Sequence, residues 1–281
     1  MIPLDLHNQL LKSPAGKQWE RIGIRHHHGI NIPLFSLHSK DSCGIGEFPD
    51  LLPLISWCKE QGLDIIQLLP LNDTGHDTSP YSALTAFALN PLHLGLSQLP
   101  LVNEHPNLLT QLPALKVLSK SQRIDYPKVL AGKERFLRNY YHSVAHDIID
   151  SDDYRNFVSK YPWLKGYALF RVLREKENWR GWETWVPNIR DLNEKVLNGL
   201  FKEFHEEITY HIFNQYLCFQ QLHKVKLEAE KHGIYIKGDI PILINRESAD
   251  VWLHQRQFLL QFAAGAPPDM YSKTGQKWGF P

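Results

Sequence analysis

Hydrophobic and polar positions follow two different periods in the first ninety residues, and each period predicts a different element. Gly29 to Leu37 alternates with period two and leads into a polar loop, which predicts a β-strand. From Asp50 to Gly62 apolar side chains recur every three or four residues, which predicts a helix with Gly62 at its end. Leu63 to Leu69 is a nearly continuous apolar run, typical of a strand covered on both faces. A strand, a helix and a strand with short links form a βαβ unit, so the pattern predicts a parallel sheet.

Between about Asn72 and Gly199 the strand pattern disappears. A long polar loop, Asn72 to Tyr81, is followed by mixed helical periodicities and by a group of tryptophans, which are Trp163, Trp179, Trp182 and Trp185. We expect a mostly helical subdomain inserted at 91–199, with these tryptophans in its core rather than on a binding surface.

The βα pattern returns after the insert. Apolar residues step by three or four from Phe201 to Val225, which predicts a long amphipathic helix ending near Gly233. Ile234 to Ile244 predicts a third strand with a break at Gly238-Asp239, and Ala263 to Pro281 is rich in glycine and proline and predicts a loop. The expected division is therefore 1–90 for the first βαβ part, 91–199 for the insert, and 200–281 for the helix, third strand and loop.

Composition and charge exclude several classes of function. Lys+Arg 31 against Asp+Glu 30 gives a net charge of +1, so nothing indicates a nucleic-acid partner or a polybasic membrane surface. No apolar run approaches the roughly 20 residues of a spanning helix, and no signal peptide follows Met1, so we expect a cytoplasmic protein. The cysteines lie far apart, which disfavours disulfides and thiolate zinc sites. Three adjacent histidines, His26 to His28, cannot all face one ion from an extended chain, so we expect no metal site there.

Candidate chemistry gathers where the predicted strands end. In parallel α/β folds the ligand site lies at the carboxyl ends of the strands. Those loops hold Ser79 and Tyr81 after the second strand, Asp239 after the third, and Gly265 to Trp278 further on. Aromatic rings interleaved with carboxylates and amides suit the apolar faces and hydroxyl rims of sugars, although other small ligands use the same side chains. No GxGxxG or GxxxxGK[ST] motif is present to cradle a phosphate.

The same segments resemble the 4-α-glucanotransferases of glycoside hydrolase family seventy-seven (amylomaltase or disproportionating enzyme). In chain order, the matching motifs are Ser36-Leu37 with Gly44-Ile-Gly-Glu-Phe48, Gln67-Leu-Leu-Pro-Leu71, Ser79-Pro-Tyr81, Asn90-Pro91, Lys237-Gly-Asp-Ile-Pro-Ile242, Ser248-Ala-Asp-Val-Trp252, Gly265-Ala-Pro-Pro-Asp269 and Thr274-Gly-Gln-Lys-Trp-Gly279. One departure stands at the end, where Phe280-Pro281 replaces the Asn-Pro usual in the family.

The resemblance implies an α/β fold, a TIM (β/α)8 barrel of the amylase-like clan, represented here by roughly its first three strands and a helical insert. It implies a glycosyltransferase of starch, glycogen and maltooligosaccharide metabolism. Such an enzyme transfers an α-1,4-glucan segment to the 4-OH of an acceptor by retaining double displacement, without metal or cofactor. The substrate-binding residues that the resemblance implies are Ser79, Tyr81, Asp239, Asp269, Tyr271, Gln276 and Trp278.

The catalytic carboxylates of the family come from later strands, and none is expected in this chain. Its one Arg-Ile-Asp, Arg123 to Asp125, lies in the predicted insert and is followed by Tyr-Pro instead of the family's His. We expect the catalytic residues downstream of Pro281, in a missing C-terminal half of the same protein, and we expect the 281-residue chain to be inactive alone. Two alternatives stay open: a catalytically dead glucan-binding fragment, and an α-glucan hydrolase of the same clan.

Overall fold

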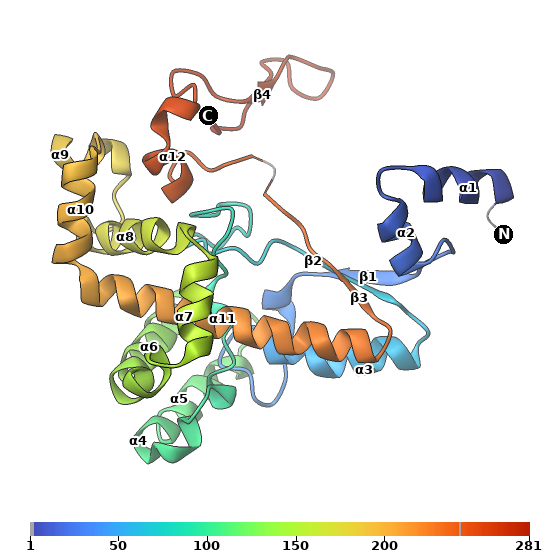
Figure 1. The fold of residues 1–281 in the computed structure, drawn as a ribbon, viewed down its shortest axis with the longest axis horizontal. Coiled ribbons are helices and arrows are strands. Elements are labelled where there is room, and N and C mark those ends of the chain that lie inside the picture. Colours follow the sequence, from blue (N-terminus) through green and yellow to red (C-terminus); the bar gives the residue numbers. More distant parts are fainter. Residues whose placement is uncertain (1–2, 242) are drawn as a thin grey trace.

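A three-stranded parallel sheet forms the centre of the βα part of the molecule (Figure 1). The computed structural model describes residues 3–241 and 243–281. Strand β1 (Gly29–Ile32) pairs with β2 (Ile65–Leu68), and β2 pairs with β3 (Tyr235–Lys237), so Ile65 lies between Gly29 and Tyr235. Helices α3 (Leu51–Glu60) and α11 (His205–Lys231) run side by side along the sheet. The predicted parallel βαβ unit is confirmed.

The strands are shorter than the sequence pattern predicts, because proline and turn-forming residues end them early. The prediction of a strand to Leu37 is wrong beyond Ile32, where Pro33 lacks an N–H for the ladder and Leu34–Ser36 forms a 3-10 turn. The second strand covers Ile65–Leu68 of the predicted 63–69. The third ends at Lys237, before Gly238 and Pro241 (Ile242 lies outside the described residues).

The long helix predicted from Phe201 is two helices. Helix α10 (Glu194–Glu203) and α11 are separated by Phe204, whose φ of −105° and ψ of 29° leave the helical region. Helix α11 then runs for 27 residues and ends just before Gly233, which adopts the left-handed φ of 69° expected of a C-terminal glycine.

The predicted insert, residues 91–199, consists mostly of helices. It contains helices α4 (Pro106–Leu109), α5 (Leu112–Lys116), α6 (Tyr126–Ile149), α7 (Asp152–Lys160), α8 (Trp163–Lys176) and α9 (Pro187–Arg190), of which α6, α7 and α8 pack against α11 (Figure 1). Trp182 and Trp185 are buried in its core, and Trp163 and Trp179 are partly buried against it. One hydrophobic cluster runs through both sheet and insert, so the boundaries at 90 and 199 stay predictions.

Two further segments lie outside the sheet and the insert. Helices α1 (Leu4–Lys12) and α2 (Gly16–Ile22) stand at the end of the sheet remote from the insert (Figure 1). After α12 (Ala249–Leu253), the tail predicted as loop contains a small antiparallel hairpin of β4 (Gly265–Ala266) and β5 (Gln276–Lys277). That part of the prediction is wrong, because Gly265 lets the two backbones approach closely enough to pair.

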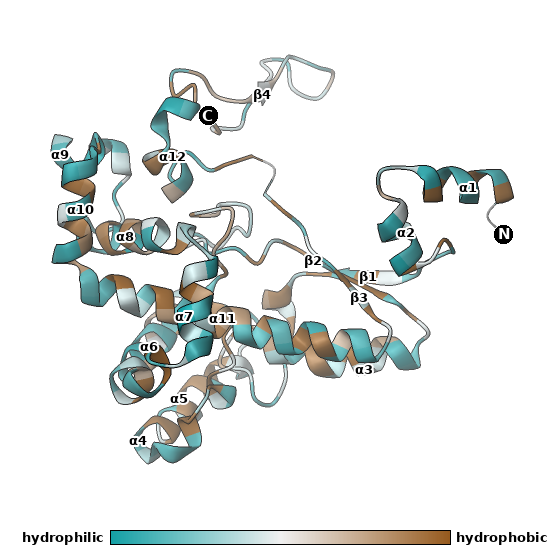
Figure 2. Ribbon diagram, in the orientation of Figure 1, coloured by the Kyte–Doolittle hydropathy of each residue, from teal (hydrophilic) through white to brown (hydrophobic). Residues whose placement is uncertain are grey.

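Hydrophobic and hydrophilic residues alternate along α3 and along the C-terminal half of α11 (Figure 2). These parts pack with one face and meet water with the other, whereas residues 210–218 of α11 are buried on every side. None of the helices in residues 3–241 and 243–281 is both long enough and apolar enough to cross a membrane.

Candidate functional site

Tyr81 and Asp239 meet beyond the carboxyl ends of β2 and β3. The Tyr81 hydroxyl donates to Asp239 Oδ2 at 3.0 Å, across 158 positions of sequence. This contact raises the pKa of Tyr81, because the neighbouring carboxylate disfavours a phenolate, and the hydroxyl stays a donor. The structure therefore brings together two residues that the sequence selected separately.

The loop that carries Tyr81 is shaped by side chain to backbone hydrogen bonds. The backbone N–H of Ser79 donates to Asp77 Oδ1 at 2.8 Å, and the N–H of Tyr81 donates to Ser79 Oγ at 3.4 Å. These local bonds leave the Tyr81 side chain 45% exposed. A half-exposed aromatic ring beside a carboxylate offers a ligand both an apolar face and hydrogen-bond acceptors.

The other predicted site residues form a separate group on the hairpin. Asp269 Oδ1 accepts the backbone N–H groups of Tyr271 and Ser272 at 2.8 and 2.6 Å, so this carboxylate shapes a turn. The indole N–H of Trp278 donates to Gln276 Oε1 at 2.9 Å. Tyr271 is 90% exposed. No hydrogen bond or ion pair among the described residues joins this group to Tyr81 and Asp239, so the predicted site divides in two.

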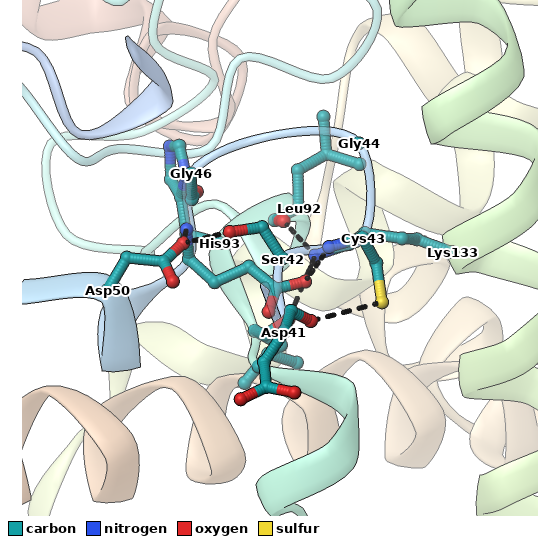
Figure 3. A network of polar contacts seen from close by, with 12 residues as sticks. Asp41, Ser42, Cys43, Gly44, Gly46, Asp50, Leu92, His93 and Lys133 are labelled. Atoms are coloured by element: carbon teal, nitrogen blue, oxygen red, sulfur yellow. Dashed lines mark hydrogen bonds and ion pairs between the residues drawn. The ribbon is translucent and has the colours of Figure 1, made fainter. Parts of the chain in front are cut away.

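The loop after β1 is held by a buried polar network (Figure 3). The Ser42 hydroxyl donates to Asp50 Oδ2 at 2.8 Å, and the backbone N–H of Glu47 donates to the same oxygen at 2.7 Å. The N–H of Cys43 donates to Glu47 Oε1 at 3.1 Å. Burial, together with Glu47, raises the pKa of Cys43 to about 12, so its thiol stays protonated and is no nucleophile.

Lys133 joins this network to the insert, and the sequence analysis missed it. Its ammonium donates to Glu47 Oε1 and to the carbonyls of Leu92 and Leu94, the latter two at 2.7 and 2.9 Å. Lys133 is 1% exposed. A lysine four residues after Val129, on the apolar face of a predicted helix, was the available signal.

Asp250 ties the loop after β2 to α12. Its carboxylate accepts the N–H of Ala86 at 2.9 Å and the Thr85 hydroxyl at 3.3 Å. Burial raises the pKa of Asp250, and these two donors oppose the shift. Asp250 thus fixes the loop after β2 from a position 164 residues further along the sequence.

Comparison with known proteins decides the family. The family model described as 4-alpha-glucanotransferase matches residues 32–281. The chain belongs to the 4-alpha-glucanotransferase family. The resemblance found in the sequence is therefore confirmed.

Relatives of this chain agree in name and in extent. A 4-alpha-glucanotransferase of Chlamydia pneumoniae is 42% identical over 271 residues, which cover 96% of this chain and 51% of that protein. Amylomaltase from Streptococcus agalactiae, solved in complex with acarbose, superposes with a TM-score of 0.79 at 25% identity, over 92% of this chain and 53% of its own. Amylomaltase from Corynebacterium glutamicum shares the fold, with a TM-score of 0.70. The chain spans about half the length of the curated relatives it matches.

The Arg-Ile-Asp at 123–125 has a structural role in this chain. Asp125 caps the start of α6, accepting the N–H of Lys128 at 3.3 Å, and it also pairs with the Lys128 ammonium at 2.8 Å. Both contacts lower the pKa of Asp125. A capping carboxylate of this kind stabilises the helix, so Asp125 is not assigned a catalytic role.

Proposed function

We propose that this chain forms one side of the α-1,4-glucan groove of a 4-α-glucanotransferase. The observation that carries the proposal is the contact between Tyr81 and Asp239, which joins the loops after two neighbouring parallel strands. Membership of the family and the resemblance to amylomaltase structures support it.

In this proposal the Tyr81 ring stacks on the apolar face of a glucose unit, and the Asp239 carboxylate accepts hydrogen bonds from the hydroxyls of that glucose. Ser79 holds the turn that presents Tyr81. The hairpin residues Asp269, Tyr271, Gln276 and Trp278 close over the bound glucan from the other side. Tyr271 and Trp278 are 90% and 46% exposed, which leaves both rings free to contact a glucan.

We also propose that β1, β2 and β3 are the first strands of a (β/α)8 barrel and that the insert stands beside it. The complete enzyme transfers a glucan segment by retaining double displacement with a pair of carboxylates. We assign neither carboxylate to these 281 residues, and the 281-residue chain alone is expected to be inactive. The three free, buried cysteines support a reducing, cytoplasmic location.

Maltoheptaose binding, measured by calorimetry on the 281-residue chain, tests the groove. Tyr81→Ala and Asp239→Asn are each expected to weaken binding by about tenfold, the effect of losing one ring stack or one charge-assisted hydrogen bond. Trp57→Ala is the matched control, because Trp57 on α3 is 46% exposed and Tyr81 is 45% exposed. Equal affinities for Tyr81→Ala and the control would contradict the proposal.

Incubation with maltotriose tests the catalytic part of the proposal. We expect no change in oligomer length with the 281-residue chain. A ladder of longer and shorter products from this chain would show that it holds its own catalytic carboxylates. Glucose release without a ladder would favour the hydrolase alternative.

A further inference from the structure

The loop that carries Ser79 and Tyr81 is anchored in the insert by a buried carboxylate. Asp73 is 1% exposed and accepts hydrogen bonds from the Tyr167 hydroxyl and from Arg171 Nη1, the latter at 3.1 Å. Its other oxygen accepts the N–H of Gly75 at 2.9 Å. The start of the loop is thus bound to two side chains of α8, one helical turn apart.

A strained segment that follows α8 contacts the same loop from its other side. Asn178 and Trp179 adopt left-handed φ values of 51° and 61°, which are costly for residues other than glycine. The Trp179 ring stacks on the His76 ring, with 3.9 Å between centroids and 25° between planes. A Cβ on Gly75, itself at φ 60°, would stand 2.2 Å from the Trp179 ring.

Two arginines of α8 cover the Trp179 ring as well. The guanidinium carbons of Arg171 and Arg174 lie 4.8 and 5.6 Å from the ring centroid. Cation–π contacts of this kind fix the orientation of the indole. Trp179 therefore lies between the loop and α8, in contact with both.

The same helix also holds the loop after β3. Tyr167, Arg171 and Arg174 occur at i, i+4 and i+7 and so share one face of α8. Arg174 donates to Glu247 Oε2 at 2.8 Å. One helix face therefore fixes the loop that leads to Tyr81 and the segment that follows Asp239.

We propose that Trp179 is a positioning residue for glucan binding. Held in its strained conformation by the two arginines, its ring clamps Gly75 and His76 and so sets where the loop presents Tyr81 to Asp239. The left-handed backbone at Trp179 is kept because in this conformation the ring contacts Gly75, His76 and the two arginines. The inference rests on the proposed function, since it assigns Trp179 to the same groove.

Hydrogen exchange and glucan binding together test the role of Trp179 in the 281-residue chain. In Trp179→Ala, amide exchange across 72–84 is expected to rise about tenfold while the amides of α11 keep their rates, since only the local clamp is lost. Maltoheptaose affinity is expected to fall about fivefold. Trp179→Phe retains an aromatic ring, so its exchange rates across 72–84 and its maltoheptaose affinity are expected to stay close to those of the unaltered chain. Trp57→Ala serves as the exposed-tryptophan control.

A second variant acts from the loop side and keeps the test decisive if Trp179→Ala unfolds. His76→Ala removes the ring on which Trp179 stacks and is expected to raise exchange across 72–84 in the same way. Exchange in this segment that matches the Trp57→Ala control in both variants, or that rises equally throughout the protein, would overturn the inference. If the unaltered chain binds no maltoheptaose, the proposed function fails, while the exchange result still decides whether Trp179 clamps the loop.

Discussion

Lys133 is a charged residue at the centre of an otherwise apolar helix face, and its environment explains why it is tolerated there. Each of its three protons has an acceptor: the Glu47 carboxylate and two backbone carbonyls. Burial raises the pKa of Glu47, and the lysine opposes that shift. The pair is thus a structural bridge between α6 and the loop after β1.

Lys133→Met is therefore expected to destabilise the chain by about 3–5 kcal/mol, because it leaves Glu47 buried without its counter-charge. Lys133→Met combined with Glu47→Gln removes the stray charge and keeps an acceptor for the Cys43 N–H, so it should recover part of the loss. Urea unfolding of the three proteins measures both effects. Equal stability of the single and double variants would show that the charge of Glu47 is not what the lysine compensates.

Single residues also show where sequence reasoning stops. Tyr81 and Asp239 were selected because each follows a predicted strand, and parallel strands bring their carboxyl ends to one edge. Trp179 was expected only in the core of the insert, because its left-handed backbone and its contact with Gly75 come from tertiary packing. The spacing of apolar residues predicts local elements and does not predict contacts between residues about a hundred positions apart.

At the scale of elements, α11 acts as the axis that joins insert and sheet. Two buried glutamines six residues apart on this helix each bind a backbone segment through both amide atoms. Gln215 accepts the N–H of Leu89 at 2.9 Å and donates to its carbonyl at 2.8 Å. Gln221 does the same for Gly95, at 2.8 and 3.0 Å. Each glutamine thus supplies the hydrogen-bond partners of one backbone N–H and one backbone C=O.

Gln215→Leu and Gln221→Leu should each cost about 1–3 kcal/mol, because each leaves a buried N–H and C=O without a partner. The two losses should add in the double variant, since the glutamines bind separate segments. Unfolding free energies in urea test this, with His223→Leu as an exposed control on the same helix. A loss no larger than that of the control would mean that water replaces the glutamines.

The element pattern was predictable where local periodicity decides it. Helix α3, the parallel order of the strands and the helical insert followed from spacing alone. The end of β1 did not, because the alternation continues to Leu37 although Pro33 cannot donate to the ladder. The helix break at Phe204 could not be predicted from the sequence, because Phe201 and Phe204 both pack against the core and so continue the helical spacing of apolar residues.

At the scale of the whole molecule, the sheet has an outer edge at β3 with no strand beside it among the described residues. A hollow of about 890 Å³ lies along this edge, with α2 and α11 among its walls. Its apolar lining includes Ile65, Leu68, Leu71, Leu222, Ile234 and Ile236. Ile240, just beyond β3, is 71% exposed. An unpaired strand edge beside an apolar surface favours pairing with another chain.

We therefore expect the 281-residue chain to self-associate with increasing concentration, through the β3 edge. Ile240→Lys places a charge beside this edge and removes an aliphatic side chain that association would bury. The dissociation constant of the self-associated form should therefore rise about tenfold. Leu4→Lys is the matched control, since Leu4 is 76% exposed and belongs to α1, which lies away from β3 (Figure 1). Sedimentation velocity across a concentration series separates the two variants. If both variants associate equally, the β3 edge is not the contact between copies. If the unaltered chain stays monomeric at every concentration, the twist of the sheet and its flanking helices protect the β3 edge.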